Sequence, residues 1–136
     1  MRVVLDTNIL FSALISPHGF PDAIYRAWRA ARFEVVTSRT QLDEIRRASR
    51  YPKFQAVLQP ARVGVMVNNL QRAVVLDRLD VKAEADDPDY AFLLAMAIVS
   101  DADYLVTGDR RAGLLQRGHI KRTRIVTPAV FCEEVL

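Results

Sequence analysis

Short apolar runs alternate with segments of helical periodicity along the chain. The runs lie at residues 3–5, 33–36, 74–76, 104–106 and 124–126. Between them, apolar residues recur on one helix face in three groups: Ile24, Ala27, Trp28 and Ala31; Leu42 and Ile45; and Phe92, Leu93, Met96 and Ala97. Strands without polar alternation are typical of a parallel sheet covered on both faces. The pattern predicts an α/β fold, a three-layer α/β/α sandwich with a mostly parallel central sheet of about five strands.

Two helix starts can be read from the sequence. Ser38 and Gln41 form an S-x-x-Q pattern, which predicts a capping box at the start of the helix that follows. Asp87 followed by Pro88 predicts an N-cap and the first residue of another helix. Asp89 then falls in the first turn of that helix, above its apolar face.

Three polar residues, Asp6, Thr7 and Asn8, interrupt the apolar N-terminal segment where the first strand should pass into a helix. A buried charge without a partner is strongly unfavourable, so the fold must supply one for Asp6. Ligands of open parallel sheets bind at the carboxyl ends of the strands. Three further acids are expected near that edge: Glu44, Asp89 and Asp109.

Carboxylates gathered at one edge repel each other unless a cation is present. Mg²⁺ and Mn²⁺ prefer oxygen ligands, and they polarise phosphodiesters and activate water. We therefore expect Asp6, Glu44, Asp89 and Asp109 to bind one or two such ions. Taken singly, Asp6 also suits a helix cap, Glu44 a helix surface and Asp109 a turn. Asp86 or Asp87 is an alternative to Asp89, or an assistant to it.

The chain has 19 basic and 16 acidic residues, and its formal net charge is +3. Most of the basic residues are arginines, which bind phosphate in a bidentate manner. They form three groups along the sequence: Arg26, Arg29 and Arg32; Arg46, Arg47, Arg50 and Lys53; and Arg110, Arg111, Arg117, Lys121, Arg122 and Arg124. These groups indicate either a solvated surface or a face that binds a polyanion.

A length of 136 residues without a linker or repeat predicts a single domain over residues 1–136. The apolar fraction is 51% and the charged fraction is 26%, which is typical of a globular protein. Cys132 is the only cysteine, so an intramolecular disulfide is excluded and a cytoplasmic location is expected. No apolar run approaches the length of a membrane span.

Three segments together resemble a known family: VVLDTNIL, LDEI and DPDYAFLLAMAIVSDADYLVTGDRR. In this order they are similar to the motifs of the PIN-domain ribonucleases, especially the toxins of VapBC-type toxin–antitoxin pairs. The resemblance implies a metal-dependent endoribonuclease in which the four acids are catalytic and bind Mg²⁺ or Mn²⁺. It further implies that Thr7, Asn8 and Thr107 support the acids or contact RNA, and that Arg110 and Arg111 hold its phosphates.

The resemblance also implies partners, and other functions remain open. The expected partners are an RNA substrate, a cognate antitoxin in the acidic crevice and a second copy of the chain. Ile24, Trp28 and Leu42 belong either to the dimer interface or to the core. One alternative is an inactive PIN-like scaffold that binds RNA or protein. A second is a phosphatase with an aspartate nucleophile, although Asn8 stands where its second Asp is expected. His18 and His119 lie in loop-like sequence.

Overall fold

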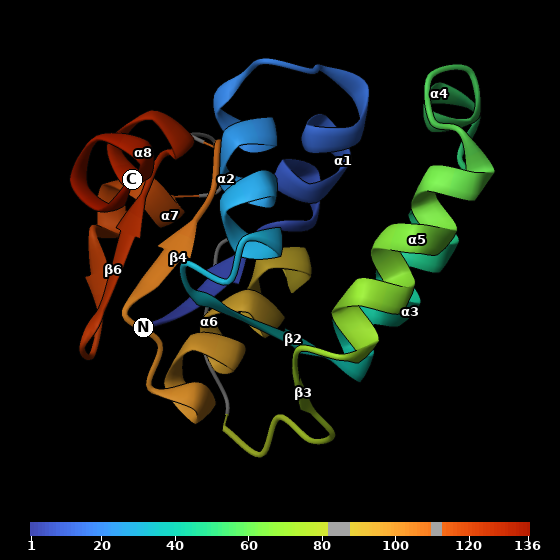
Figure 1. Cartoon of the computed structure of the whole chain (residues 1–136). Helices are drawn as coiled ribbons and strands as arrows, with labels where there is room; N and C mark the ends of the chain where they lie inside the picture. Colours follow the sequence, from blue (N-terminus) through green and yellow to red (C-terminus); the bar gives the residue numbers. More distant parts are fainter. Residues whose placement is uncertain (82–87, 110–112) are drawn as a thin grey trace.

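The computed structural model describes residues 1–81, 88–109 and 113–136, with only the backbone of Pro88 and Asp89. Its middle layer is a six-stranded sheet in the order β3-β2-β1-β4-β6-β5 (Figure 1). The strands are β1 (Arg2–Leu5), β2 (Glu34–Ser38), β3 (Val74–Leu76), β4 (Tyr104–Val106), β5 (His119–Ile120) and β6 (Thr123–Val126). All neighbouring strands are parallel except β5 and β6, which pair in antiparallel orientation.

The prediction of a mostly parallel sheet is confirmed, and all five expected strands are present. The short edge strand β5 was not expected, because two residues leave no periodic signal. It contains His119, so the expectation of a loop at that residue was wrong. In the middle of the sheet, Val4 of β1 pairs with Val36 on one side and Leu105 on the other.

Helices cover both faces of the sheet, which confirms the three-layer sandwich (Figure 1). The helices are α1 (Thr7–Ile15), α2 (Phe20–Arg29), α3 (Arg39–Ala48), α4 (Pro52–Gln55), α5 (Pro60–Gln71), α6 (Pro88–Ser100), α7 (Leu114–Arg117) and α8 (Pro128–Val135). Val3 and Leu5 pack in the core beneath α1 and α2, whereas Val4 packs in the core beneath α6. Buried residues thus point to both faces of one strand, as the uninterrupted apolar runs predict.

One expectation about a helix face was wrong, and one alternative that the sequence left open is decided. Helix α2 ends at Arg29, and Ala31 is exposed with a positive φ of 62°, so it does not share the apolar face of α2. The residues considered for a dimer interface, Ile24, Trp28 and Leu42, are 0%, 7% and 5% exposed and belong to the core of one chain. A contact between copies of the chain would therefore need other residues.

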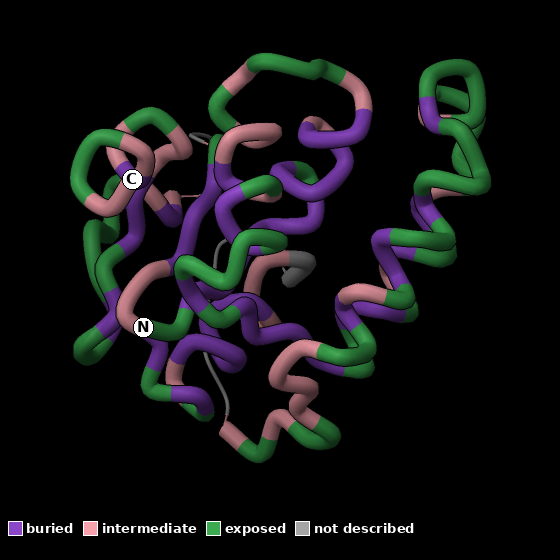
Figure 2. The backbone as a smooth tube through the Cα atoms, viewed as in Figure 1, coloured by how far each residue is buried: buried purple, intermediate pink, exposed green. Residues whose placement is uncertain are grey.

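Helices α3, α4 and α5 form an arm beside the sheet, with α4 at the end far from β3 (Figure 1). Val63, Met66, Val67 and Leu70 form the buried side of α5. Figure 2 shows buried and exposed stretches alternating along this helix. Within the described ranges, no helix is both long and apolar enough to span a membrane.

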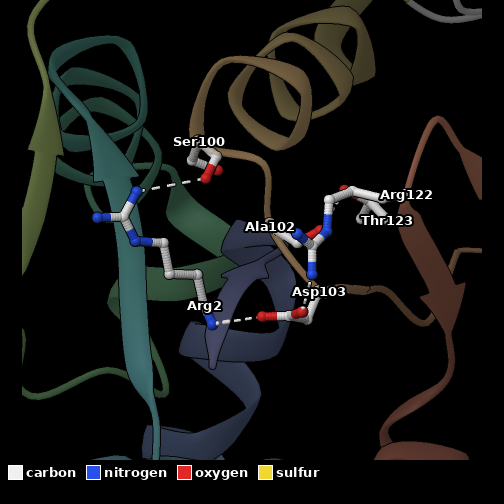
Figure 3. Close-up of polar contacts among 6 residues, drawn as sticks. All are labelled: Arg2, Ser100, Ala102, Asp103, Arg122 and Thr123. Carbon is white, nitrogen blue, oxygen red and sulfur yellow. Dashed lines mark hydrogen bonds and ion pairs between the residues drawn. The ribbon is translucent and has the colours of Figure 1, made fainter.

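Asp103 ties three segments together at the amino ends of the central strands, which is the edge opposite Asp6. Its carboxylate accepts hydrogen bonds from the backbone N–H of Arg2 at 2.9 Å and from the Arg122 guanidinium at 2.7 Å (Figure 3). Nearby, the Thr123 hydroxyl donates to the carbonyl oxygen of Ala102 at 2.6 Å (Figure 3). The N–H of Arg2 and the Arg122 guanidinium hold the pKa of Asp103 below its usual value.

We predict that Asp103→Asn lowers the free energy of unfolding at neutral pH by about 1 kcal/mol, because a charged acceptor is lost at a partly exposed site. The lowered pKa means that the charge stabilises the fold above the unfolded pKa and ceases to do so as the pH falls through the folded pKa. The difference between wild type and variant, measured by urea unfolding, should therefore shrink in acid. Asp101→Asn is the matched control, since Asn tolerates the positive φ of 50° there. An equal loss in the control would contradict the assignment.

Candidate active site

Asp6 lies at the junction of β1 and α1 and is 3% exposed. Its backbone N–H donates to the carbonyl oxygen of Val106 at 3.0 Å, which continues the pairing of β1 with β4 by one residue. Its Oδ1 accepts from the backbone N–H of Asn8 at 3.1 Å, so Asp6 is the N-cap of α1. The capping alternative for Asp6 is thus observed, and the cap fixes one carboxylate oxygen at the strand end.

The second oxygen of Asp6 is held from the neighbouring strand. The Thr107 hydroxyl donates to Asp6 Oδ2 at 2.7 Å and in turn accepts from the backbone N–H of Asp109 at 3.1 Å. Thr107 is fully buried, directly after β4. The polar segment after β4 and the polar junction after β1 therefore form one hydrogen-bonded unit, as expected from the meeting of parallel strand ends.

The pKa of Asp6 is raised above its usual value, and burial is the main cause. The hydrogen bonds from Thr107 and Asn8 oppose this shift, and the negative charge of Asp109 adds to it. The influence of Asp109 shows that the two carboxyl groups interact electrostatically. Positive charge near Asp6 would favour its ionised form.

A buried polar network beside Asp6 was not predicted as part of the site. Gln41 is 1% exposed, and its Nε2 donates to the carbonyl oxygen of Leu5 at 2.7 Å and to Thr7 Oγ1 at 3.4 Å. Its Oε1 accepts from the Thr37 hydroxyl at 2.8 Å. The network joins the carboxyl ends of β1 and β2, so it fixes the position of the residues before and after Asp6.

Only half of the predicted capping box is present, because the side chain of Gln41 belongs to this buried network. Ser38 Oγ accepts from the backbone N–H of Gln41 at 3.1 Å, as the S-x-x-Q pattern predicts. The side chain of Gln41, however, turns inward to Leu5 instead of back to Ser38. The Ser38 hydroxyl donates to the sulfur of Met96 in α6. The sequence signal for this network was an uncharged polar cluster, Thr37, Ser38 and Gln41, at a strand end.

A cavity of about 220 Å³ joins two of the four predicted acids. Asp6 lies at the end of β1 and Glu44 on α3, and both are among the residues that line this cavity. The lining residues are Asp6, Asn8, Glu44, Arg47, Ala48, Tyr51, Lys53, Phe54, Tyr90, Phe92 and Leu93. The cavity thus combines acids with cations and with four aromatic rings.

The other two predicted acids, Asp89 and Asp109, are not shown to line this cavity. Asp109 acts on Asp6 through its charge and through Thr107, but it is not among the residues that line the cavity. The backbone of Asp89 lies at the start of α6, next to Tyr90, which does line it. The side chain of Asp89 lies outside the described residues. So do four further residues named from the sequence: Asp86, Asp87, Arg110 and Arg111.

Over the described residues, no three or more His, Cys, Asp or Glu side chains gather closely enough to hold a metal ion. The described donors are nevertheless of a suitable kind. Mg²⁺ keeps several of its waters and binds through one or two carboxylates, and Asp6 and Glu44 both line the cavity. The donor chemistry therefore fits a hard divalent cation that is held partly by water.

Two members of the second basic group lie at the cavity, whereas Arg46 of the same group pairs with Asp43. Arg47 and Lys53 line it and are exposed. Members of the other groups are engaged elsewhere: Arg26 pairs with Asp22, Arg122 with Asp103, and Arg124 with Glu134. The polyanion-binding interpretation is thus best supported for the group on α3 and α4.

A family model described as PIN domain matches residues 2–111. The chain belongs to the PIN domain family. PIN domains are generally nucleases and typically use divalent metal ions. The match spans β1 to β4 and includes all of the predicted site residues.

A solved structure gives the same fold. The PIN domain of human SMG5 superposes with a TM-score of 0.55 at 17% identity, covering 98% of this chain and 99% of that chain. At this identity the likeness concerns the fold alone. No curated protein matches the chain.

We predict that Gln41→Leu destabilises the protein by about 2 kcal/mol, because it leaves the Leu5 carbonyl and the Thr37 hydroxyl buried without their partner. The measurement is chemical denaturation of both proteins. Gln71→Leu, at the exposed end of α5, is the matched control and should change stability little. Equal effects of the two variants would show that the network does not hold the strand ends.

We predict that Asp6→Asn raises the thermal stability of the metal-free protein at neutral pH. Because the folded pKa of Asp6 is raised, its contribution to stability is complete below the unfolded pKa and is lost as the pH rises through the folded pKa. Asn keeps an acceptor for the Asn8 N–H without the buried charge. Thermal melts in chelator should therefore show a gain that disappears in acid. A lower melting temperature for the variant at neutral pH would contradict this account.

Proposed function

We propose that the protein is a metal-dependent endoribonuclease that hydrolyses RNA phosphodiesters. One observation carries the proposal: in a PIN domain, a single small cavity combines the carboxylates of Asp6 and Glu44 with the cations of Arg47 and Lys53. Acids that bind Mg²⁺ or Mn²⁺, next to cations that bind phosphate, are the requirements of phosphodiester hydrolysis. Asp89 and Asp109 complete the proposed catalytic and metal-binding set.

The residues have distinct proposed tasks. Asp6 and Glu44 hold the metal ion, and the Asn8 N–H and the Thr107 hydroxyl keep the Asp6 carboxylate in one orientation. Bound there, the ion supplies Lewis acidity toward a phosphoryl oxygen and activates water. Arg47 and Lys53 attract the RNA backbone and offset the repulsion between its phosphates and the acids.

The supporting residues predicted from the sequence divide by exposure. The side chain of Asn8 is exposed at the cavity and is placed to contact substrate. Thr7 is buried against Gln41, so we propose a positioning role for it. Arg110 and Arg111 remain proposed phosphate contacts on the basis of the resemblance.

We further propose that the protein is a VapC-like toxin, one domain over residues 1–136, that acts on cytoplasmic RNA and is controlled by a cognate antitoxin. The antitoxin is expected in the acidic crevice, and a hollow of about 680 Å³ along α3, α4 and α5 offers it a second contact surface. Its wall includes apolar Leu58, Val63 and Val67 beside Arg46 and Arg50, which suits an amphipathic acidic segment. We also propose a homodimer, with an interface outside the core residues named above.

A PIN-like scaffold that binds RNA without cutting it is the second candidate. The observation that favours it is that the described residues contain no group of three potential metal ligands. The scaffold and the nuclease share the cations at the cavity, so they differ in cleavage and not in RNA binding.

The deciding measurement is cleavage of structured and unstructured RNAs in Mg²⁺, in Mn²⁺ and in chelator. We expect the wild type to cut RNA only when metal is present. In Asp6→Asn and Glu44→Gln the cleavage rate should fall by more than about 100-fold, which is a larger loss than is typical for residues that only support metal ligands. Asp43→Asn is the matched control for Glu44, since Asp43 is its exposed neighbour on α3 and pairs only weakly with Arg46 at 3.6 Å. It should cut as the wild type does.

Each other result has a definite meaning. Equal cutting by the wild type and both acid variants would identify a contaminating nuclease and remove the catalytic proposal. RNA binding without cutting, by the wild type and variants alike, would establish the scaffold.

A further inference from the structure

One wall of the acidic cavity comes from the short helix α4 and the residue before it. Tyr51, Lys53 and Phe54 of this segment line the cavity together with Asp6. The segment is anchored at both ends of its turn: the Tyr51 N–H donates to the Ala48 carbonyl at 3.0 Å, and the Tyr51 carbonyl accepts from Phe54 at 2.9 Å. These bonds fix the backbone of the segment beside the cavity.

Phe54 is the structural residue of this wall. Its ring packs on Phe11 of α1 with a centroid separation of 4.7 Å, and Lys53 Nζ lies 4.9 Å from the centroid of the Phe54 ring. Because Phe11 is in the core, this contact fixes α4 to the body of the protein. It also holds the Lys53 ammonium group over an aromatic ring at the cavity.

Tyr51 is differently placed. It is 45% exposed although it lines the cavity. Within the part of the chain that the structure describes, no other aromatic ring packs against it, unlike Phe54 on Phe11 or Tyr25 on Trp28. An anchored aromatic ring that stays open to solvent beside a cavity offers a surface on which a planar ligand can stack.

The charges on this side complement a phosphate. Arg47 and Lys53 make no ion pair with the described residues, whereas Arg46, on the same helix as Arg47, pairs with Asp43. An aromatic ring with two cations beside it matches one nucleotide, in which the base stacks and the adjoining phosphates bind the cations.

We propose that Tyr51, Lys53 and Arg47 form a nucleotide clamp that binds one unpaired nucleotide of RNA beside Asp6 and Glu44. The clamp rests on the function proposed above and adds to it a residue, Tyr51, that contacts a base of the RNA. In a duplex the base faces are stacked, so Tyr51 has no face to contact.

The clamp is tested by RNA binding in chelator, where its contacts need no metal and no cleavage occurs. The probes are a fluorescent single-stranded oligouridine, an abasic strand of equal length and an RNA duplex. We expect Tyr51→Leu to bind oligouridine about 10-fold or more weakly, Tyr51→Phe to bind it as the wild type does, and the loss to vanish on the abasic strand. Phe20→Leu removes an exposed ring at the start of α2 and serves as the matched control.

The role of Lys53 is tested separately, by the salt dependence of RNA binding. Lys53→Gln should lower the slope of log affinity against log salt by about 0.7, the value for one phosphate contact on a single strand. Lys121→Gln, on the turn between β5 and β6, is its control. Thermal melts of each variant establish that it is folded.

Three results would overturn the clamp: wild-type affinity of Tyr51→Leu for oligouridine, duplex binding as tight as single-strand binding, or no binding of oligouridine in chelator. None of these three results bears on metal-dependent cleavage, which the cleavage assay tests separately. Conversely, Tyr51-dependent binding by a protein that does not cut would support the clamp and refute the nuclease.

Discussion

The structure depends on holding one buried carboxylate, that of Asp6, at the carboxyl edge of the sheet. Its two oxygens are satisfied from different directions, by the start of α1 and by Thr107 after β4. Burial still raises its pKa, so these hydrogen bonds do not fully replace water. The Asp6 carboxylate is fixed in position, and its ionised form is still disfavoured by burial. Such a group is suited to binding a cation, although it lowers the stability of the metal-free protein.

The surrounding polar residues make this arrangement rigid. Gln41 ties the end of β1 to the end of β2, and Thr107 ties it to the segment that carries Asp109. Among the described residues, no buried side-chain nitrogen or oxygen lacks a hydrogen-bond partner, so the polar layer is internally complete. The opposite edge is joined by Asp103, through a partly exposed carboxylate whose pKa is lowered. The two edges thus differ in the pKa of their carboxyl groups. The pKa is raised at Asp6, in the candidate site, and lowered at Asp103, which joins three segments of the fold.

The arm supplies the positive charge and the exposed aromatic ring at the cavity. The edge presents acids, which repel nucleic acid, whereas α3 and α4 bring Arg47, Lys53 and Tyr51 to the same cavity. Phe54 connects α4 to the core through Phe11, and this contact places the backbone of the segment with Tyr51 and Lys53 beside the cavity.

The sequence by itself determined the layers, all five longer strands and the position of Asp6 at a strand end, because these follow from local periodicity and from the rule that parallel strand ends meet. It also indicated that Glu44 approaches Asp6. Only the tertiary structure decided that Trp28 is core, that Gln41 turns inward and that Tyr51 faces the cavity. Those facts depend on contacts between segments far apart in the chain, such as Phe11 with Phe54, for which sequence spacing carries no signal.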